Sequence, residues 1–303
     1  MSFVHLHVHS EFSLVDGTLR INQLAKLAAE RGMPAIALTD QGNLFAMVKF
    51  YRAALSAGVK PIFGADCLLA PDGPNQPVTR LTLLAQNDQG FRHLTELLSQ
   101  AYCEGQINNK PTLRREWLTA AQTEGLIVLL GFQSDIGQYL ISERHEHINA
   151  ALAFWQERFS NRLYLELTRT NRPDEDIFTR QAVRLAQNKA LPVVATNDVR
   201  FANRADFEAH EVRVCINQSY TLDDPRRPRP YSADQYLRSA DEMAELFADI
   251  PEALENSVAI AERCNVQLQL GENYLPRFPT PNQESESEYL RALSAEGLER
   301  RLE

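Results

Sequence analysis

Short apolar runs alternate with amphipathic stretches along most of the chain. The runs predict buried strands, and between them apolar residues recur at the spacing of one helix face. The expected strands span residues 3–9, 34–38, 61–69, 81–85, 126–130, 163–167 and 193–196, and the expected helices span residues 19–31, 43–57, 88–102, 149–159 and 174–188. Thr18 is the expected N-cap of the first helix. This alternation predicts an α/β fold, because parallel strands joined by helices commonly close into a barrel.

The pattern changes after residue 197 to helices without strands. Helices are expected over residues 204–217, 232–248 and 251–264. Between the first two, residues 222–231 carry three prolines beside Arg226, Arg227 and Arg229, which makes this connection stiff and locally basic. A surface loop is favoured there over a phosphate contact, because three arginines on an acidic chain are a small patch.

A proline-rich stretch near the end predicts a domain boundary. Residues 274–281, Tyr-Leu-Pro-Arg-Phe-Pro-Thr-Pro, cannot hold a helix or a central strand. We therefore expect one domain over residues 1–272, followed over residues 273–303 by a linker and the start of a further region. The charged helical stretch stops at Glu303, so we expect the chain to be a piece of a longer protein.

Composition narrows the class of protein. Of the 303 residues, 44% are hydrophobic and 23% are charged, as in soluble globular proteins. The 31 Lys and Arg residues face 40 Asp and Glu residues, and the formal charge of −9 argues against nucleic-acid binding by the chain as a whole. The cysteines are scattered, and no apolar run is long enough for a membrane helix or a signal peptide. We expect a cytoplasmic protein without membrane contact.

The most informative segment is His5-Leu-His-Val-His9. Side chains on a strand alternate between its two faces, so His5, His7 and His9 are expected to point the same way. Imidazoles near a strand end suit a divalent metal, with carboxylates from neighbouring strand ends completing the shell. The carboxylates expected on that rim of a parallel barrel are Asp16, Asp40, Asp66 and Asp198. A metal-free group of mutually hydrogen-bonded histidines and carboxylates is the alternative that these residues leave open.

Eight segments resemble a known family in chain order between residues 3 and 281. They are HLHVHSEFSLVDG, ALTDQGNLF, KPIFGAD, LTLLAQND, VVATNDVRF, FEAHEVRV, TLDDP and FPTP. They are similar to the PHP (polymerase and histidinol phosphatase) domains at the N-terminus of bacterial replicative DNA polymerase III α subunits. The resemblance implies a distorted, TIM-like seven-stranded (β/α) barrel with extra C-terminal helices. It also implies that active members hold a cluster of metal ions, often zinc or manganese, that hydrolyses phosphate esters.

Position by position, the resemblance divides the metal ligands into two groups. The positions that keep a ligand are His7, His9, Asp16, Asp66 and Asp198. The positions that have lost one are Gln41, Arg80, Phe132 and Arg200. Phenylalanine cannot ligate, arginine is a permanent cation, and an amide oxygen replaces imidazole poorly in a zinc site. We expect at most one weakly bound divalent ion, Zn or Mn, and no required cofactor.

The lost ligands favour a non-enzymatic function. The resemblance implies that the domain serves as a scaffold within the α subunit, that the ε proofreading exonuclease docks on it, and that it meets DNA only through the full holoenzyme. It also implies that the polymerase palm begins beyond Glu303. The alternative is an active metal-dependent phosphoesterase, 3′–5′ exonuclease or pyrophosphatase.

Arginine at two of the lost positions has a physical rationale. Without metal ions, Asp16, Asp66 and Asp198 would repel one another across a shared pocket. We expect the guanidinium groups of Arg80 and Arg200 to pair with these aspartates in place of the ions.

Overall fold

A computed structural model describes residues 2–71, 73, 76–273 and 275–302. The chain divides into two compact units, Met1–Gln267 and Leu268–Glu303. The expected proline-rich stretch begins at Tyr274, which lies outside the described residues, and the domain boundary expected at residue 272 stays a prediction.

The described part of the first unit alternates strands and helices over most of its length. Its strands are β1 (Ala35–Leu38), β2 (Lys60–Leu69), β3 (Thr79–Ala85), β4 (Gln106–Ile107), β5 (Lys110–Leu113), β6 (Leu126–Leu130), β7 (Leu163–Leu167) and β8 (Val193–Ala195). Its α-helices are α1 (Ile21–Glu30), α2 (Met47–Ser56), α3 (Asp88–Glu104), α4 (Asp135–Ile141), α5 (His145–Arg158), α6 (Glu175–Lys189), α7 (Phe207–Gln218), α8 (Ala240–Leu246) and α9 (Pro251–Arg263), and short 3-10 turns lie at Arg115–Trp117 and Arg204–Asp206. The predicted α/β class is confirmed.

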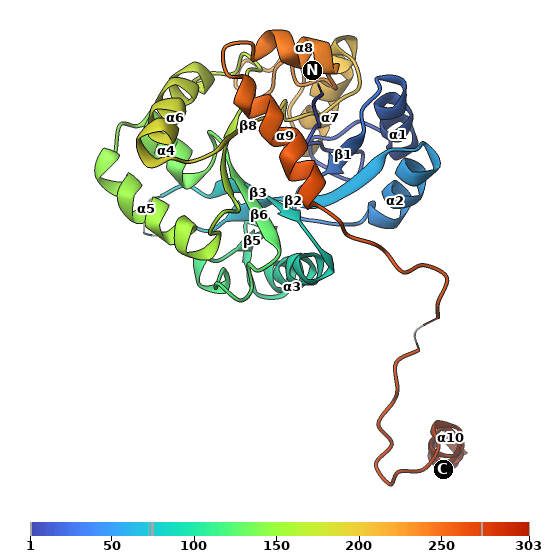
Figure 1. Ribbon diagram of the computed structural model, residues 1–303. Coiled ribbons are helices and arrows are strands. Elements are labelled where there is room, and N and C mark those ends of the chain that lie inside the picture. The colour runs from blue at the N-terminus through green and yellow to red at the C-terminus, as the bar shows by residue number, and fades with distance from the viewer. Residues whose placement is uncertain (1, 72, 74–75, 274, 303) are drawn as a thin grey trace. The chain divides into compact units, whose positions relative to one another are not determined.

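An eight-stranded mixed sheet forms the centre of this unit (Figure 1). Its order is β4-β5-β2-β3-β6-β7-β8, and β1 pairs with β2. The expectation of parallel strands throughout is wrong, because β3 runs antiparallel to both β2 and β6. Residues 70–78 between β2 and β3 are too few for the crossover of a dozen or more residues that a parallel return requires. The hydrogen bonds between the named strands form an open path rather than a closed ring.

Residues 3–9 form an extended segment rather than the expected regular strand. Val8 makes an isolated parallel bridge with Val199, which follows β8. On the other side, the N–H group of Ala37 in β1 donates to the carbonyl oxygen of His5 at 2.9 Å. The segment therefore lies between β1 and the chain after β8, where it is too sparsely bonded to form a ladder.

Several boundaries differ from the sequence-based expectations. The strands predicted at 126–130 and 163–167 agree with β6 and β7 at both ends, whereas the β4–β5 hairpin and α4 were not expected because each is short. The N-cap of α1 is Arg20 rather than Thr18, whose hydroxyl instead donates to the carbonyl oxygen of Arg200 at 3.3 Å. The sequence pattern therefore predicted where most elements lie more accurately than it predicted the residues at which they begin and end.

The helix expected over residues 232–248 is wrong in its first half. Only α8 is helical there, and it begins where Ser239 and Glu242 form a capping box. The residues before Ser239 instead bind polar groups of the interior, as described below. Tertiary hydrogen bonds therefore override the helical spacing of this stretch.

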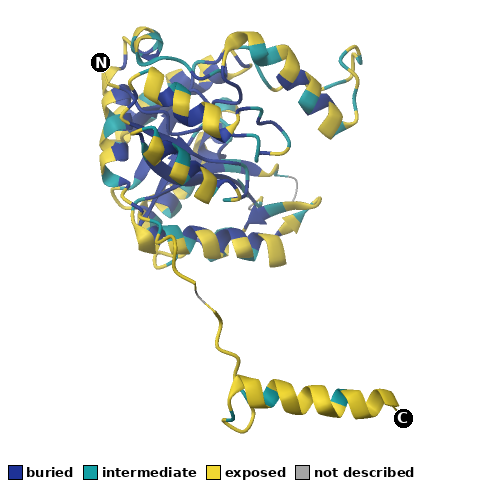
Figure 2. Cartoon of the chain, turned by 90° about the vertical axis from the view of Figure 1, so that its right-hand side faces the viewer, coloured by how far each residue is buried: buried dark blue, intermediate teal, exposed yellow. Residues whose placement is uncertain are grey.

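The core of the first unit is a contiguous apolar cluster. Alternate residues of the extended segment and the strands supply most of it, and α9, which packs against β8, covers it. The cluster consists of Val4, Leu6, Ala35, Ala37, Ile62, Leu84, Ile127, Leu129, Tyr164, Val194, Ile260, Ala261 and Cys264. Figure 2 shows the same division, with buried strands and helices whose outer faces are exposed. Val4 and Leu6 alternate with the histidines, so the segment presents its imidazoles away from this cluster.

Gly90 in α3 marks a close approach of two backbones. A β-carbon at Gly90 would lie 1.9 Å from the carbonyl oxygen of Gly125, which is a backbone atom rather than the end of a flexible side chain. We expect Gly90→Ala to lower the free energy of unfolding by about 1–3 kcal/mol in a denaturant titration. Gly297 in α10 (Glu286–Leu302) is the matched control, because its β-carbon would meet nothing within 4 Å. A Gly90→Ala variant as stable as the parent would show that the contact is loose.

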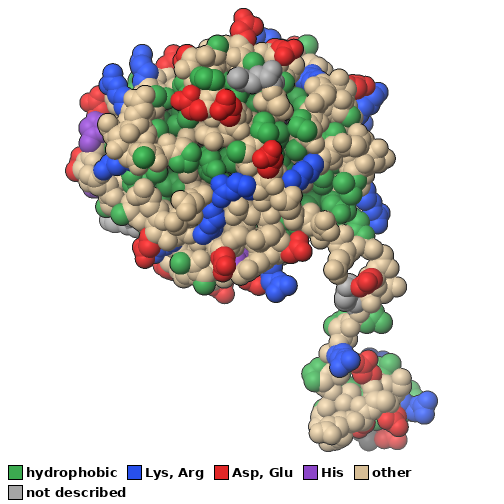
Figure 3. All heavy atoms as spheres, viewed as in Figure 1, with side chains coloured by type: hydrophobic (Ala, Val, Ile, Leu, Met, Phe, Trp, Pro, Cys, Tyr) green, Lys and Arg blue, Asp and Glu red, His purple; other side chains and the backbone are tan. Residues whose placement is uncertain are grey.

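The second unit contains α10, and none of its described helical residues is buried. Among the described residues of the whole chain, no helix is both long and apolar enough to cross a membrane. On the face drawn in Figure 3, acidic and basic side chains are interspersed with hydrophobic ones. On that face, neither positive nor negative side chains form a large continuous patch.

Candidate metal centre

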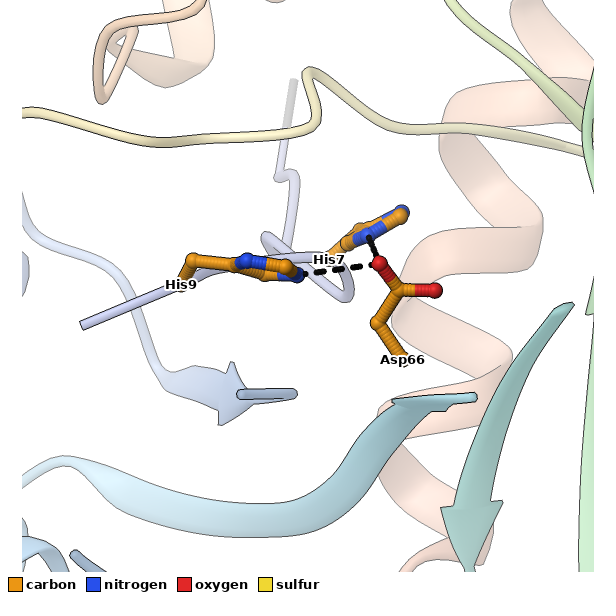
Figure 4. A group of neighbouring side chains, drawn as sticks. All are labelled: His7, His9 and Asp66. Atoms are coloured by element: carbon orange, nitrogen blue, oxygen red, sulfur yellow. Dashed lines mark ion pairs between the residues drawn. The ribbon is translucent and has the colours of Figure 1, made fainter. Parts of the chain in front are cut away.

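Two histidines and one aspartate converge in the interior of the first unit (Figure 4). His7 and His9 come from the extended segment and Asp66 from β2, and all three are buried. Nε2 of His9 lies 3.3 Å from Oδ2 of Asp66, and Nε2 of His7 lies 3.8 Å from the same oxygen. Neither Nε2 atom has a hydrogen-bond partner among the described residues. One potential ligand atom from each residue lies within 4.8 Å of the others, so these side chains do meet.

His5 does not join the group of His7, His9 and Asp66. Its Nε2 lies 2.8 Å from the carbonyl oxygen of Arg238, and its ring packs edge-on against Phe3. Burial lowers the pKa of His5 to about 4, with only partial opposition from the hydrogen bond to Arg238. His5 is therefore held by a backbone carbonyl rather than by the carboxylates near His7 and His9.

Glu166 in β7 orients His7 and was not expected from the sequence. Its Oε1 lies 2.8 Å from Nδ1 of His7 and accepts a hydrogen bond from the Thr196 hydroxyl at 2.7 Å. Burial alone would lower the pKa of His7, but the charges of Glu166 and Asp198 outweigh it and raise that pKa to about 10. The sequence feature that could have indicated this role is the single carboxylate inside the otherwise apolar run Leu163–Leu167.

The remaining expected carboxylates divide into two environments. Oδ1 of Asp16 lies 3.0 Å from Nδ1 of His9, and Oδ1 of Asp198 lies 3.4 Å from Nε2 of His7. Asp40 is held elsewhere, because its Oδ1 accepts from the Ser10 N–H at 2.6 Å and both of its oxygens accept serine hydroxyls. Burial raises the pKa of Asp40 despite these bonds. Asp40 therefore supports the turn rather than the histidine group.

The two expected arginines pair with the three expected aspartates. Arg80 Nη1 donates to Oδ2 of Asp66 at 2.9 Å. Arg200 Nη1 donates to Oδ2 of Asp16 at 2.9 Å, and its Nη2 donates to Asp198 and lies 4.0 Å from Asp66. The predicted pairing is confirmed. The Arg200 side chain is 2% exposed, whereas that of Arg80 is 25% exposed.

These cations set the ionisation of the carboxylates. Burial by itself raises the pKa of Asp16, Asp66 and Asp198. The charge of Arg200 on the first and third, and that of Arg80 on the second, outweighs burial and holds each pKa well below its usual range. The three carboxylates are therefore ionised and charge-paired at neutral pH.

A third arginine, Arg172, was not expected. It donates to Oδ2 of Asp198 at 2.5 Å and to Glu175 at 2.9 Å, and its guanidinium group lies 4.5 Å from the ring centre of Phe132. Phe132 thus provides a stacking surface where the resemblance implies a metal ligand. Gln41 contributes no ligand contact either, since its Oε1 is buried without a described partner.

Residues 231–235 cover the aspartates from outside the sheet. The Tyr231 hydroxyl donates to Oδ2 of Asp16 at 2.8 Å, and Gln235 Nε2 donates to Oδ2 of Asp198 at 3.0 Å. Of the basic loop just before them, Arg226 pairs with Asp224 at the surface. The basic loop therefore leads directly into the segment whose Tyr231 and Gln235 contact the aspartates.

The space left beside these groups is small. A cavity of about 30 Å³ is lined by His7, Asp66, Arg80, Phe132, Glu166, Arg172 and Asp198, among others. A cavity of this size has room for water.

Among the described residues, His7, His9 and Asp66 form a group of donors that could hold a divalent ion. Two imidazole nitrogens and a carboxylate oxygen are ligand types that zinc accepts, and the two unpartnered Nε2 atoms point to the same oxygen of Asp66. An ion there would have to displace the proton that His7 holds and compete with the arginines for Asp66. The positions of Arg80, Phe132 and Arg200 supply no ligand for a second or third ion.

Comparison with known proteins agrees with this geometry. The PHP domain family matches residues 5–170. The chain belongs to the PHP domain family. This PHP domain is 53% identical over 304 residues to DNA polymerase III subunit alpha of Pseudomonas aeruginosa, and 50% identical over 301 residues to that of Escherichia coli K12. The matches cover 100% and 99% of the chain but only 26% of each relative, so the chain spans about a quarter of their length.

One solved structure is similar to this chain at low sequence identity. It is a two-domain protein from Bacteroides vulgatus, described as containing a predicted PHP-like metal-dependent phosphoesterase. Its sequence is distant from that of this PHP domain, with 11% identity and a TM-score of 0.44 over 90% of this chain and 72% of that one.

Proposed function

We propose that this PHP domain is catalytically inactive and serves, within a DNA polymerase III α subunit, as a scaffold on which the ε proofreading exonuclease docks. The observation that carries the proposal is the pairing of Arg80 and Arg200 with Asp16, Asp66 and Asp198. Phosphoester hydrolysis by a metal cluster needs neighbouring ions that activate water and clamp the phosphate together. Guanidinium groups can bind a phosphate but cannot lower the pKa of a bound water in this way.

The size of the cavity supports the same proposal. The arginine side chains and the covering residues Tyr231 and Gln235 take up the space beside the histidines, leaving about 30 Å³. Ligand-binding pockets are typically ten times larger or more, about 300–1,000 Å³. A retained fold with a filled site is consistent with a structural task.

We further propose that the sheet closes into the distorted seven-stranded PHP barrel through residues 3–9. This segment bonds to β1 on one side and to the chain after β8 on the other. It thereby joins the two regions of the sheet that the named strands leave apart, and it carries His7 and His9 into the interior.

The proposed partners follow from the likeness to α subunits. A PHP domain without hydrolytic chemistry leaves proofreading to a separate exonuclease, for which it supplies the docking surface. The other proposed contacts are the remainder of the α subunit and, through the full holoenzyme, DNA.

The proposal is tested first on the chain itself. Purified without chelator, it should hold less than one tightly bound metal ion per chain by elemental analysis. It should also release no nitrophenol from bis(p-nitrophenyl) phosphate with added Zn²⁺ or Mn²⁺. Metal-dependent release above the blank would favour the alternative of an active phosphoesterase, exonuclease or pyrophosphatase.

The second arm tests docking. Mixed at micromolar concentrations, the chain and the ε subunit should elute together on gel filtration. If they elute separately, the experiment is repeated with the full-length α subunit. A complex with full-length α alone would place the contact partly outside this domain, and no complex with either would refute the docking proposal.

A further inference from the structure

We propose that the ε subunit docks on an apolar strip that crosses three separate segments of the first unit. The strip consists of six exposed hydrophobic side chains, Leu14, Phe45, Val48, Tyr102, Val212 and Ile216. The inference rests on the proposed docking function and deepens it, because it assigns the docking to one surface. Its consequence is that substitutions on this strip, but not elsewhere on the domain, should weaken the complex.

The first unit concentrates its exposed hydrophobic side chains on this strip. Among the described residues of the unit, nine large hydrophobic side chains are exposed, and six of them belong to the strip. Ile216 is 76% exposed, Leu14 is 67% exposed and Phe45 is 63% exposed. Single exposed hydrophobic residues are common on soluble proteins, whereas a contiguous group marks a surface that binds another molecule.

One contact joins the α7 part of the strip to the turn after the extended segment. Arg213 Nη2 in α7 donates to the carbonyl oxygen of Glu11 at 3.1 Å. Val212 precedes this arginine, and Ile216 lies four residues after Val212, so both are on the same side of the helix. The contact therefore holds this side of α7 beside the turn that carries Leu14.

Further contacts join the same turn to α2 and α3. Asn43 Nδ2 donates to the carbonyl oxygen of Phe12 at 3.1 Å, and Oδ1 of Asn43 accepts from the N–H of Phe45 at 3.1 Å. The ring centre of Phe45 lies 6.4 Å from that of Tyr102 in α3. The strip is therefore continuous from α7 across the turn to α3.

A groove lies at the α3 end of the strip. Its volume is about 390 Å³, and its lining residues include Leu44, Phe45, Leu98, Tyr102 and Cys103. This volume is within the range of about 300–1,000 Å³ that is usual for ligand pockets, so the groove can admit large side chains of a partner. Apolar and aromatic anchors seated in such grooves supply much of the binding energy of protein interfaces.

The strip offers apolar surface rather than charge. Nζ of Lys49 pairs with Oε1 of Glu11 at 3.3 Å and lies 5.4 Å from the ring centre of Phe12. Arg213 is held by a backbone carbonyl oxygen. Contact with a nucleic-acid backbone requires several cations that face its phosphates. The partner that fits this surface is a polypeptide with apolar side chains of its own, because the buried centre of a protein interface is depleted in charge.

The chain leaves the first unit near the other end of α2. Gln267, the last residue of this unit, lines a cavity together with Leu55 and Gly58 beside the C-terminal end of that helix. Phe45 and Val48 lie at its N-terminal end, and ten helical residues span about 15 Å. A separate subunit on the strip therefore does not have to displace the chain where it leaves the unit.

Cys103 is a natural reporter of this surface. It is exposed and lines the groove, whereas the other three cysteines, Cys67, Cys215 and Cys264, are buried. The 303-residue chain is treated with N-ethylmaleimide, with and without ε, and modification of Cys103 is followed by peptide mass spectrometry. At an ε concentration about ten times the Kd, only about a tenth of the chain is free, so the rate of modification should fall about tenfold.

Two substitutions test the strip itself. Phe45→Ser and Ile216→Ser each remove an exposed apolar side chain, and each should raise the Kd for ε at least about tenfold, because such anchors dominate interface energies. Ile177→Ser is the matched control, since Ile177 is 40% exposed on α6 and lies outside the strip. Its Kd should equal that of the parent. All three side chains are exposed, so the variants should keep the Tm of the parent.

The inference and the docking function fail in different ways. An unchanged Cys103 rate in a complex with ε, or strip variants that bind ε as tightly as the parent, would overturn the strip but leave docking on another surface. If ε binds only the full-length α subunit, the same labelling is done there. Protection that appears only with ε supports the strip, and protection already present without ε assigns it to the rest of α. If ε binds neither protein, docking itself is refuted.

Discussion

Arg172→Met is expected to lower the free energy of unfolding by about 3–5 kcal/mol, because it leaves buried carboxylates without their cation. Arg172 donates to Asp198 and Glu175, and all three side chains are almost fully buried. Methionine retains an unbranched apolar stem that can still pack on Phe132. The loss therefore reports the charged contacts more than the packing.

Arg169 provides the matched control for this prediction. It lies on the same connection after β7 and donates to both oxygens of Asp249, at 2.6 Å and 2.7 Å, but that aspartate is 62% exposed. Because water screens this pair, Arg169→Met should cost no more than about 1 kcal/mol. Both variants are compared by urea denaturation at neutral pH. Equal losses would mean that burial of Arg172 adds nothing to its contribution.

Restoring the lost ligand positions should give the largest change in metal content. The variant combines Gln41→His, Arg80→His, Phe132→His and Arg200→His. It removes two of the cations that compete for the carboxylates and adds imidazole ligands, so the domain should bind more than one Zn²⁺ or Mn²⁺ ion per chain. Elemental analysis after gel filtration measures the number, and circular dichroism confirms that both proteins are folded.

A surface variant controls for nonspecific binding by added histidines. It carries the same four residue types changed to histidine at exposed positions, Gln106→His, Arg52→His, Phe278→His and Arg300→His. Its metal content should match that of the parent. If the fourfold interior variant also matches the parent, then the assignment of Gln41, Arg80, Phe132 and Arg200 to former ligand positions is wrong.

Features that depend on neighbouring residues could be predicted from the sequence alone. The runs Leu126–Leu130 and Leu163–Leu167 are strands at the predicted boundaries, because a mostly apolar run of that length suits a strand buried on both faces. The two-residue spacing of His7 and His9 placed both imidazoles beside Asp66. Asp16, Asp66 and Asp198 implied compensating cations, and Arg80 and Arg200 supply them.

Features that depend on distant residues were decided only by the tertiary structure. The coil in place of a helix before Ser239, and the contacts of Glu166 with His7 and of Arg172 with Asp198, arise between segments that are apart in the chain. His7 and Glu166, for example, are separated by 159 positions. Periodicity shows which face of an element is apolar, but it does not show which polar side chain the folded backbone brings opposite another. The sequence therefore determined the elements, the paired histidines and the need for buried cations, whereas the tertiary structure decided which groups fill the former metal site.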